Sequence, residues 1–136
     1  MPRHLLTLGL SCLLLAACDE QNAVGPTVPL NQQFTLAPGE SASIENTSIR
    51  IEFMRVSGDS RCPADAVCIQ GGDARVEVRV SNGSSARYDL HTGDQSRAAV
   101  THAGGFRIEL VQLQPYPFSS RTIAPGDYRA TLTVSQ

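Results

Sequence analysis

The chain contains no lysine and no tryptophan, and only 5% of its 136 residues are aromatic. Arginine and a few histidines therefore carry all the positive charge, and the formal net charge is −2. A charge this small and this mixed does not indicate binding to nucleic acid or to a membrane surface, and we expect no nucleic-acid partner. The shortage of aromatic rings argues against a carbohydrate site built by ring stacking.

No apolar run reaches the length of a membrane-spanning helix. The longest, residues 5–15, has eleven residues, whereas a span needs about 20. It follows Arg3 and His4 and precedes small residues, an order typical of a secretory signal peptide. We therefore expect residues 1–17 to be removed on export.

The end of this signal, Leu15-Ala16-Ala17-Cys18, resembles the bacterial lipobox. The resemblance implies that Cys18 is lipidated and begins the mature chain, which would be anchored in the cell envelope and face the periplasm. Asp19 resembles the signal that retains enterobacterial lipoproteins at the inner membrane. The sequence leaves the choice between inner and outer membrane open.

The mature chain divides into a tether and one domain. Residues 18–31 are polar and interrupted by prolines, which predicts a flexible tether behind the lipidated cysteine. Residues 32–136 have the length of a single domain. Without Arg3, ten arginines face thirteen acidic residues, which gives a net charge of −3.

Apolar and polar residues alternate in the domain with the period of β-strands. The alternation is clearest in residues 73–81, 85–90 and 128–134, and no segment has helical spacing. The sequence predicts an all-β, immunoglobulin-like two-sheet sandwich of about seven or eight strands, with a small closed β-barrel as the alternative. Phase changes in residues 49–56 and 106–113 indicate β-bulges.

The register of the hairpin around Asn82-Gly83 depends on the length of its loop. A two-residue loop would place apolar and charged residues on one face. A three-residue loop, residues 82–84, sets Arg79 against Arg87, whereas a five-residue loop, residues 82–86, pairs Arg79 with Asp89. Opposite charges favour the five-residue loop.

Two cysteines remain after export and lipidation. Cys12 leaves with the signal and Cys18 is lipidated, so Cys62 and Cys68 are expected to form a disulfide in an oxidising compartment. Five residues separate them, unlike the spacing of a zinc knuckle or of a Cys-x-x-Cys redox motif.

The cysteines lie in a long connection, residues 57–72, whose Asp59-Ser60-Arg61-Cys62-Pro63 segment is followed by Cys68 and two glycines. This pattern resembles an uncharacterised family of small secreted and lipid-anchored bacterial proteins. Members often have a tryptophan just after the second cysteine, where this chain has Ile69 and Gln70. The resemblance implies the β domain and no activity.

Residues Asp59 and Arg61 are candidate binding residues in this connection. In the structural interpretation, which we favour, Arg61 pairs with Asp59 or Asp65 and helps the disulfide to hold the loop. In the functional interpretation, Arg61 awaits an anionic or carboxylate ligand. A second long connection, residues 114–127, contains Tyr116 and Phe118, which either form a contact patch or cover an open end of the sandwich.

No catalytic, metal-binding or cofactor-binding motif is recognisable. His91 and His102 belong to no catalytic motif and are expected at the surface. Met54, the one methionine of the mature chain, offers little to a copper site, and Asp89, Asp94 and Asp127 fit no calcium loop. The sequence predicts no enzyme, no metal and no cofactor.

The function that these features favour is that of a lipid-anchored envelope module, either binding or structural. Its two long loops would contact an envelope protein or a glycan. The alternative is a periplasmic enzyme, or an inhibitor of a cell-wall hydrolase.

Overall fold

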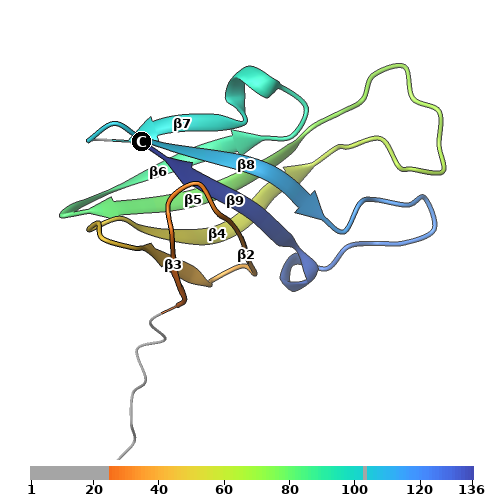
Figure 1. Ribbon diagram of the computed structural model, residues 1–136. Helices are drawn as coiled ribbons and strands as arrows, with labels where there is room; N and C mark the ends of the chain where they lie inside the picture. Colours follow the sequence, from red (N-terminus) through yellow and green to blue (C-terminus); the bar gives the residue numbers. More distant parts are fainter. Residues whose placement is uncertain (1–24, 103) are drawn as a thin grey trace, which may run out of the picture.

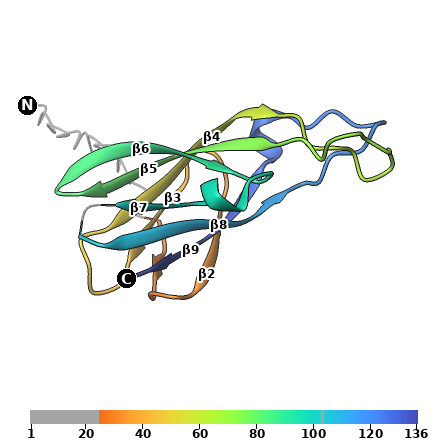
Figure 2. The ribbon, with the colours of Figure 1, turned by 90° about the horizontal axis from the view of Figure 1, so that it is seen from above.

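The computed structural model describes residues 25–102 and 104–136. Two β-sheets pack face to face and do not close into a barrel (Figures 1 and 2). The predicted all-β sandwich is confirmed, and the closed-barrel alternative is wrong. The signal peptide, Cys18 and Asp19 lie outside the described residues.

The two sheets contain five and four strands. The larger has the order β1-β3-β4-β5-β6, with β1 (Thr27–Val28), β3 (Ser41–Ile44), β4 (Arg50–Asp59), β5 (Ala74–Asn82) and β6 (Ser84–His91). The smaller has the order β2-β9-β8-β7, with β2 (Gln33–Leu36), β9 (Arg129–Ser135), β8 (Phe106–Gln114) and β7 (Ala99–His102). Two short 3-10 helices are η1 (Gln95–Arg97) and η2 (Pro125–Asp127).

The ordered domain begins earlier than residue 32. Thr27 pairs with Ser43 in parallel, and Val28, which is buried, belongs to the core. The prediction of a tether through residue 31 is therefore wrong at its end, because a strand of two residues between Pro26 and Pro29 is too short to show an alternation.

The core forms where the two sheets face each other. Val76, Val78 and Val80 point inward from β5 and are fully buried, as the alternation predicts. Ile108 of β8 and Leu132 of β9 face them from the other sheet. Burying a side chain of this size contributes about 1.5–3 kcal/mol, so these inward-facing residues are a main source of the stability of the sandwich.

Both predicted bulges are present. The β4–β5 pairing shifts register between Phe53 and Arg55, and the β8–β9 pairing shifts between Leu110 and Gln112. The second bulge leaves Val111 about half exposed on β8 while Leu110 remains buried.

The predicted five-residue hairpin loop, residues 82–86, is wrong. Strands β5 and β6 pair in the register of the three-residue alternative, residues 82–84, which places Arg79 opposite Arg87. The like charges are tolerated because Arg79 forms an ion pair with Glu52 of β4, on its other side, at 2.8 Å. The charges of β6 therefore do not by themselves determine how β5 and β6 pair, because β4 also supplies a partner for Arg79.

Candidate functional site

Two long loops leave the same end of the sandwich. Strand β4 runs to Asp59, so the first connection is shorter than predicted and comprises residues 60–73, which we call the disulfide loop. Residues 115–124, between β8 and η2, form the proline-rich loop. The two loops project together beyond the ends of the sheets (Figures 1 and 2).

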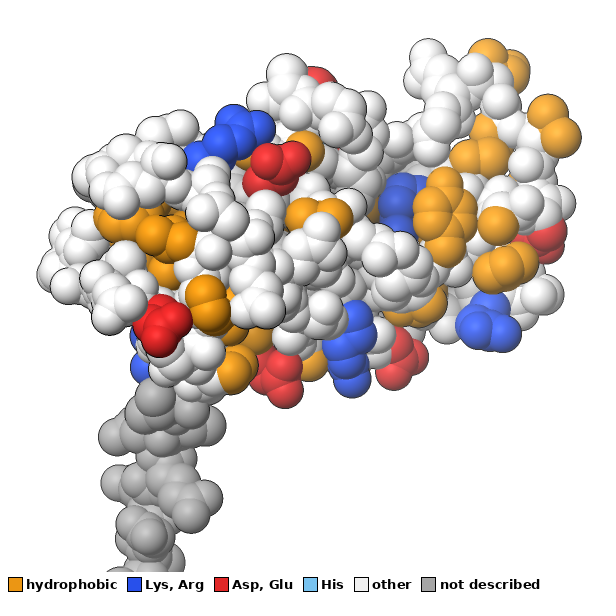
Figure 3. Space-filling model, in the orientation of Figure 1, with side chains coloured by type: hydrophobic (Ala, Val, Ile, Leu, Met, Phe, Trp, Pro, Cys, Tyr) orange, Lys and Arg blue, Asp and Glu red, His pale blue; other side chains and the backbone are white. Residues whose placement is uncertain are grey.

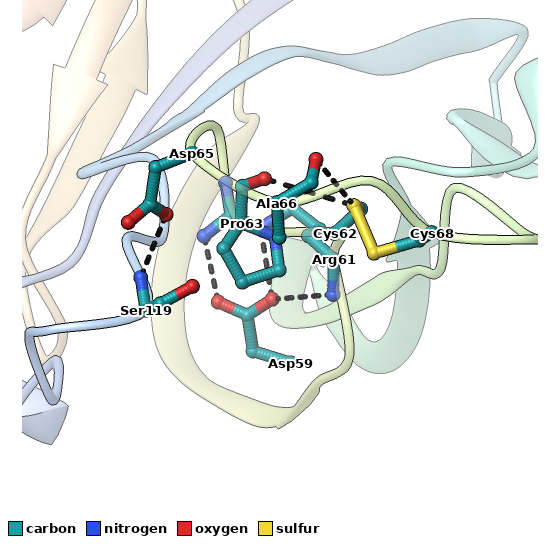
Figure 4. Close-up of a disulfide and its surroundings, with 8 residues drawn as sticks. All are labelled: Asp59, Arg61, Cys62, Pro63, Asp65, Ala66, Cys68 and Ser119. Atoms are coloured by element: carbon teal, nitrogen blue, oxygen red, sulfur yellow. Dashed lines mark hydrogen bonds and ion pairs between the residues drawn. A yellow bond between two sulfur atoms is a disulfide. The ribbon is translucent and has the colours of Figure 1, made fainter.

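The Arg61 side chain is 5% exposed and joins the two loops. Its guanidinium donates to both carboxylate oxygens of Asp59, at 2.9 and 2.6 Å (Figure 4). It also donates to the carbonyl oxygens of Leu113, at 2.8 Å, and Pro115, at 3.0 Å. The structure therefore supports the structural interpretation of Arg61, and four of its donors point at protein oxygens rather than at solvent.

Asp59 remains an anion in this buried pair. Burial raises the pKa of its carboxyl group, but hydrogen bonds from Arg61 and Tyr128 outweigh that effect and hold the pKa below the ordinary value. The Tyr128 hydroxyl donates to Asp59 at 3.0 Å. Burial and the neighbouring carboxylate raise the pKa of Tyr128. The three groups form one closed hydrogen-bonded cluster.

The predicted disulfide is confirmed, since Cys62 and Cys68 are bonded (Figure 4). Next to it, Asp65 accepts a hydrogen bond from the backbone of Ser119 at 2.8 Å and not from Arg61. The backbone N–H of Ala64 donates to the carbonyl of Pro117 at 2.9 Å. The disulfide loop is thus closed on itself and fastened along the proline-rich loop.

Gly72 closes the base of the disulfide loop. Its φ of +67° is strained for any side chain, and a Cβ there would lie 1.7 Å from the carbonyl oxygen of Ser60. Opposite it, the Ser60 N–H donates to the carbonyl of Asp73 at 2.7 Å. The glycine of the Asp-Ser-Arg-Cys-Pro motif therefore has a structural role in this chain.

Four large apolar side chains are exposed to solvent on the two loops. Val67 and Ile69 of the disulfide loop are fully exposed, and Tyr116 and Phe118 of the proline-rich loop are 46% and 44% exposed. Figure 3 shows hydrophobic side chains over this projecting end of the molecule. Tyr116 and Phe118 thus keep nearly half of their surface in solvent instead of covering the core, which favours the contact-patch interpretation.

A cleft of about 210 Å³ lies beside Tyr116, between the ends of β6 and β8. Its lining includes Arg61, His91 and Gln95. The Arg61 guanidinium lies 5.3 Å from the centre of the Tyr116 ring and supports one side of it. Because Arg61 is paired with Asp59, the cleft offers no free charge from this residue to an anionic ligand.

His91 lines this cleft, but the prediction that it lies at the surface is wrong. It is 3% exposed, with Nδ1 2.5 Å from an Asp73 oxygen and Nε2 2.6 Å from a guanidinium nitrogen of Arg97. A guanidinium only donates, so Nε2 accepts and Nδ1 carries the proton. Both ring nitrogens are occupied, and neither contacts a nucleophile. Helix η1 carries Arg97 over the strand end, which alternation alone does not reveal.

His102 is also buried, at 4% exposure, and not at the surface as predicted. Its Nδ1 is 2.8 Å from the Tyr88 hydroxyl, and the two rings meet edge to face with centroids 5.8 Å apart. Its Nε2 has no hydrogen-bond partner among the described residues. The burial arises because the chain crosses from β6 in one sheet to β7 in the other, which brings His102 back against β6.

The described ranges contain no group of three or more His, Cys, Asp or Glu side chains placed to hold a metal ion. Within the same ranges, no helix is long and apolar enough to cross a membrane. Comparison with protein-family models, with curated proteins and with solved structures finds no match to the chain.

Proposed function

We propose that the protein is a lipid-anchored binding module of the bacterial cell envelope, and that its two fastened loops form the binding surface. One observation carries this proposal. Of the five exposed large hydrophobic side chains among the described residues, four lie on these loops: Val67, Ile69, Tyr116 and Phe118. Exposed apolar side chains that are concentrated on one part of a protein surface are typical of an interaction site.

The rigidity of the loops supports the same conclusion. Binding costs less conformational entropy when a loop already has its bound shape. Here a disulfide, the Arg61 cluster and the Ala64–Pro117 hydrogen bond restrict both loops before any partner arrives. Such loops on a rigid β scaffold are a common arrangement for recognition.

The position of the loops suits an anchored protein. Thr27 pairs with Ser43, which pairs with Arg50 at the start of β4, whereas the disulfide loop follows Asp59 at the other end of that strand. Nine residue steps along β4 span about 30 Å. A chain anchored through Cys18 would therefore enter the domain far from the loop tip, leaving the tip free to meet a partner.

In-cell photo-crosslinking tests the proposal. A photoreactive side chain is placed at Tyr116 or at Ile69, and a control is placed at Arg87, which is exposed on β6. We expect adducts from both loop positions and none from the control. The same adducts from Arg87, or no adduct from either loop position, would contradict the proposal.

A further inference from the structure

We infer that residues 67–70, at the tip of the disulfide loop, are a wedge that enters an apolar peptide-binding cleft of a partner protein. The inference rests on the proposed function and specifies the kind of partner. The wedge is part of the loop that projects beyond the sheets (Figure 2), and the segments on both sides of it are held by hydrogen bonds, so we expect the complementary surface to be concave.

The side chains of the wedge fit apolar pockets. Val67 and Ile69 are fully exposed, while Cys68 between them is held by its bond to Cys62. An aliphatic side chain gains most when it leaves water for a closely packed pocket. Two such side chains on either side of the disulfide-bonded Cys68 present two apolar groups close together.

The backbone of the wedge is also free to bind. No N–H or carbonyl group of residues 67–70 forms a hydrogen bond with another described residue, although neighbouring groups do: Ala66 donates to Pro63 and Cys62 donates to Gly71. Clefts that bind peptides pair with the main chain and accept side chains in adjacent pockets. The wedge presents both kinds of group together.

Charge and position favour a protein cleft over a lipid surface. Asp65 is the one ionisable side chain in residues 62–71, and it is engaged by the Ser119 backbone. The wedge thus has no cation with which to hold an anionic headgroup. It also lies at the end of β4 opposite to the strand pairing through which the chain enters the domain.

Mapping of crosslinks in the full lipidated chain tests the wedge. Photoreactive side chains are placed singly at Val67, Ile69, Tyr116 and Arg87, and mass spectrometry identifies the partner residue in each adduct. We expect Val67 and Ile69 to react with residues that line one cleft of a single protein, and Tyr116 to react with the rim of that cleft.

Several outcomes would overturn the wedge. Adducts of Val67 and Ile69 with lipid would show that the wedge contacts a bilayer and not a protein cleft. Adducts scattered over a flat surface of the partner protein would show that the wedge enters no cleft. Adducts from Tyr116 without any from Val67 or Ile69 would refute the wedge and leave the proposed function standing. Silence at all three loop positions would overturn both.

Discussion

Arg61 donates two parallel hydrogen bonds to the carboxylate of Asp59, two residues before it in the chain, and both side chains are nearly inaccessible to solvent. The pair lies where β4 ends and the disulfide loop begins. Through its remaining donors, Arg61 reaches carbonyl groups 52 and 54 residues away. A local ion pair thereby determines how two distant loops are arranged.

Removal of Arg61 is expected to destabilise the whole domain. Arg61→Ala leaves the Asp59 carboxylate buried without its counter-charge and two carbonyl groups without a donor. We expect the free energy of unfolding in urea to fall by about 3 kcal/mol. Arg87→Ala, a matched loss of an exposed arginine, should change it by less than about 0.5 kcal/mol. Equal effects would show that the Arg61 pair contributes no more than a surface charge does.

Asp59 should make the protein sensitive to acid. Its pKa is lower in the folded state than in the unfolded chain, so its contribution to stability is complete above the unfolded value of about 3.9. That contribution is lost as pH falls from there through the lower folded value. When thermal unfolding is measured between pH 6 and pH 2, we expect the midpoint temperature to decrease once the pH is below about 4. The Asp59→Asn variant should unfold at a lower temperature at neutral pH, and its unfolding temperature should fall less steeply as the pH is lowered. An equally steep fall in the variant would show that Asp59 does not cause the acid sensitivity.

His91 should carry a proton on Nδ1 and accept a hydrogen bond at Nε2. Arg97 donates to Nε2 and Asp73 accepts from Nδ1, so the opposite tautomer would bring two donors together. Two-dimensional NMR of the ¹⁵N-labelled imidazole at neutral pH distinguishes the two nitrogens. Arg97→Gln should weaken this preference, and a dominant Nε2–H form in the unaltered chain would refute the arrangement.

Cys18 should determine membrane association. Since we propose that this residue carries the lipid, Cys18→Ser is expected to leave an unprocessed precursor without acyl chains. The Cys18→Ser variant should no longer be labelled by a radioactive or tagged fatty acid supplied to the cells, whereas the Cys12→Ser variant should still be labelled. Labelling that survives Cys18→Ser would contradict the lipobox assignment.

The sequence predicted the parts of the fold that depend on local pattern. Alternation identified β5, whose valines are all buried, and changes of phase identified the bulges of β4 and β8. The pairing of Arg61 with Asp59 was one of two predicted choices, because the residues are close in sequence. These features depend on neighbours within a few positions along the chain.

The errors concern contacts between distant segments. The β5–β6 register depends on Glu52, which lies on a third strand, and the burial of His91 depends on η1, which folds over the strand end. The carbonyl partners of Arg61 lie on β8 and just after it. The local pattern of the sequence does not indicate which distant strand or turn will lie against a residue, so these contacts could not be predicted from it.

The most direct test of the loop surface compares two matched substitutions in one crosslinking measurement. Ile69→Asp places a charge at the loop tip, and Val111→Asp places the same charge on a half-exposed apolar position of β8, outside both loops. The yield of the adduct from a photoreactive Tyr116 position is measured in each background. We predict a fall of at least about tenfold with Ile69→Asp, equivalent to about 1.4 kcal/mol of binding free energy, and little change with Val111→Asp. Equal yields in the two backgrounds would contradict the assignment of the loop tip as the binding surface.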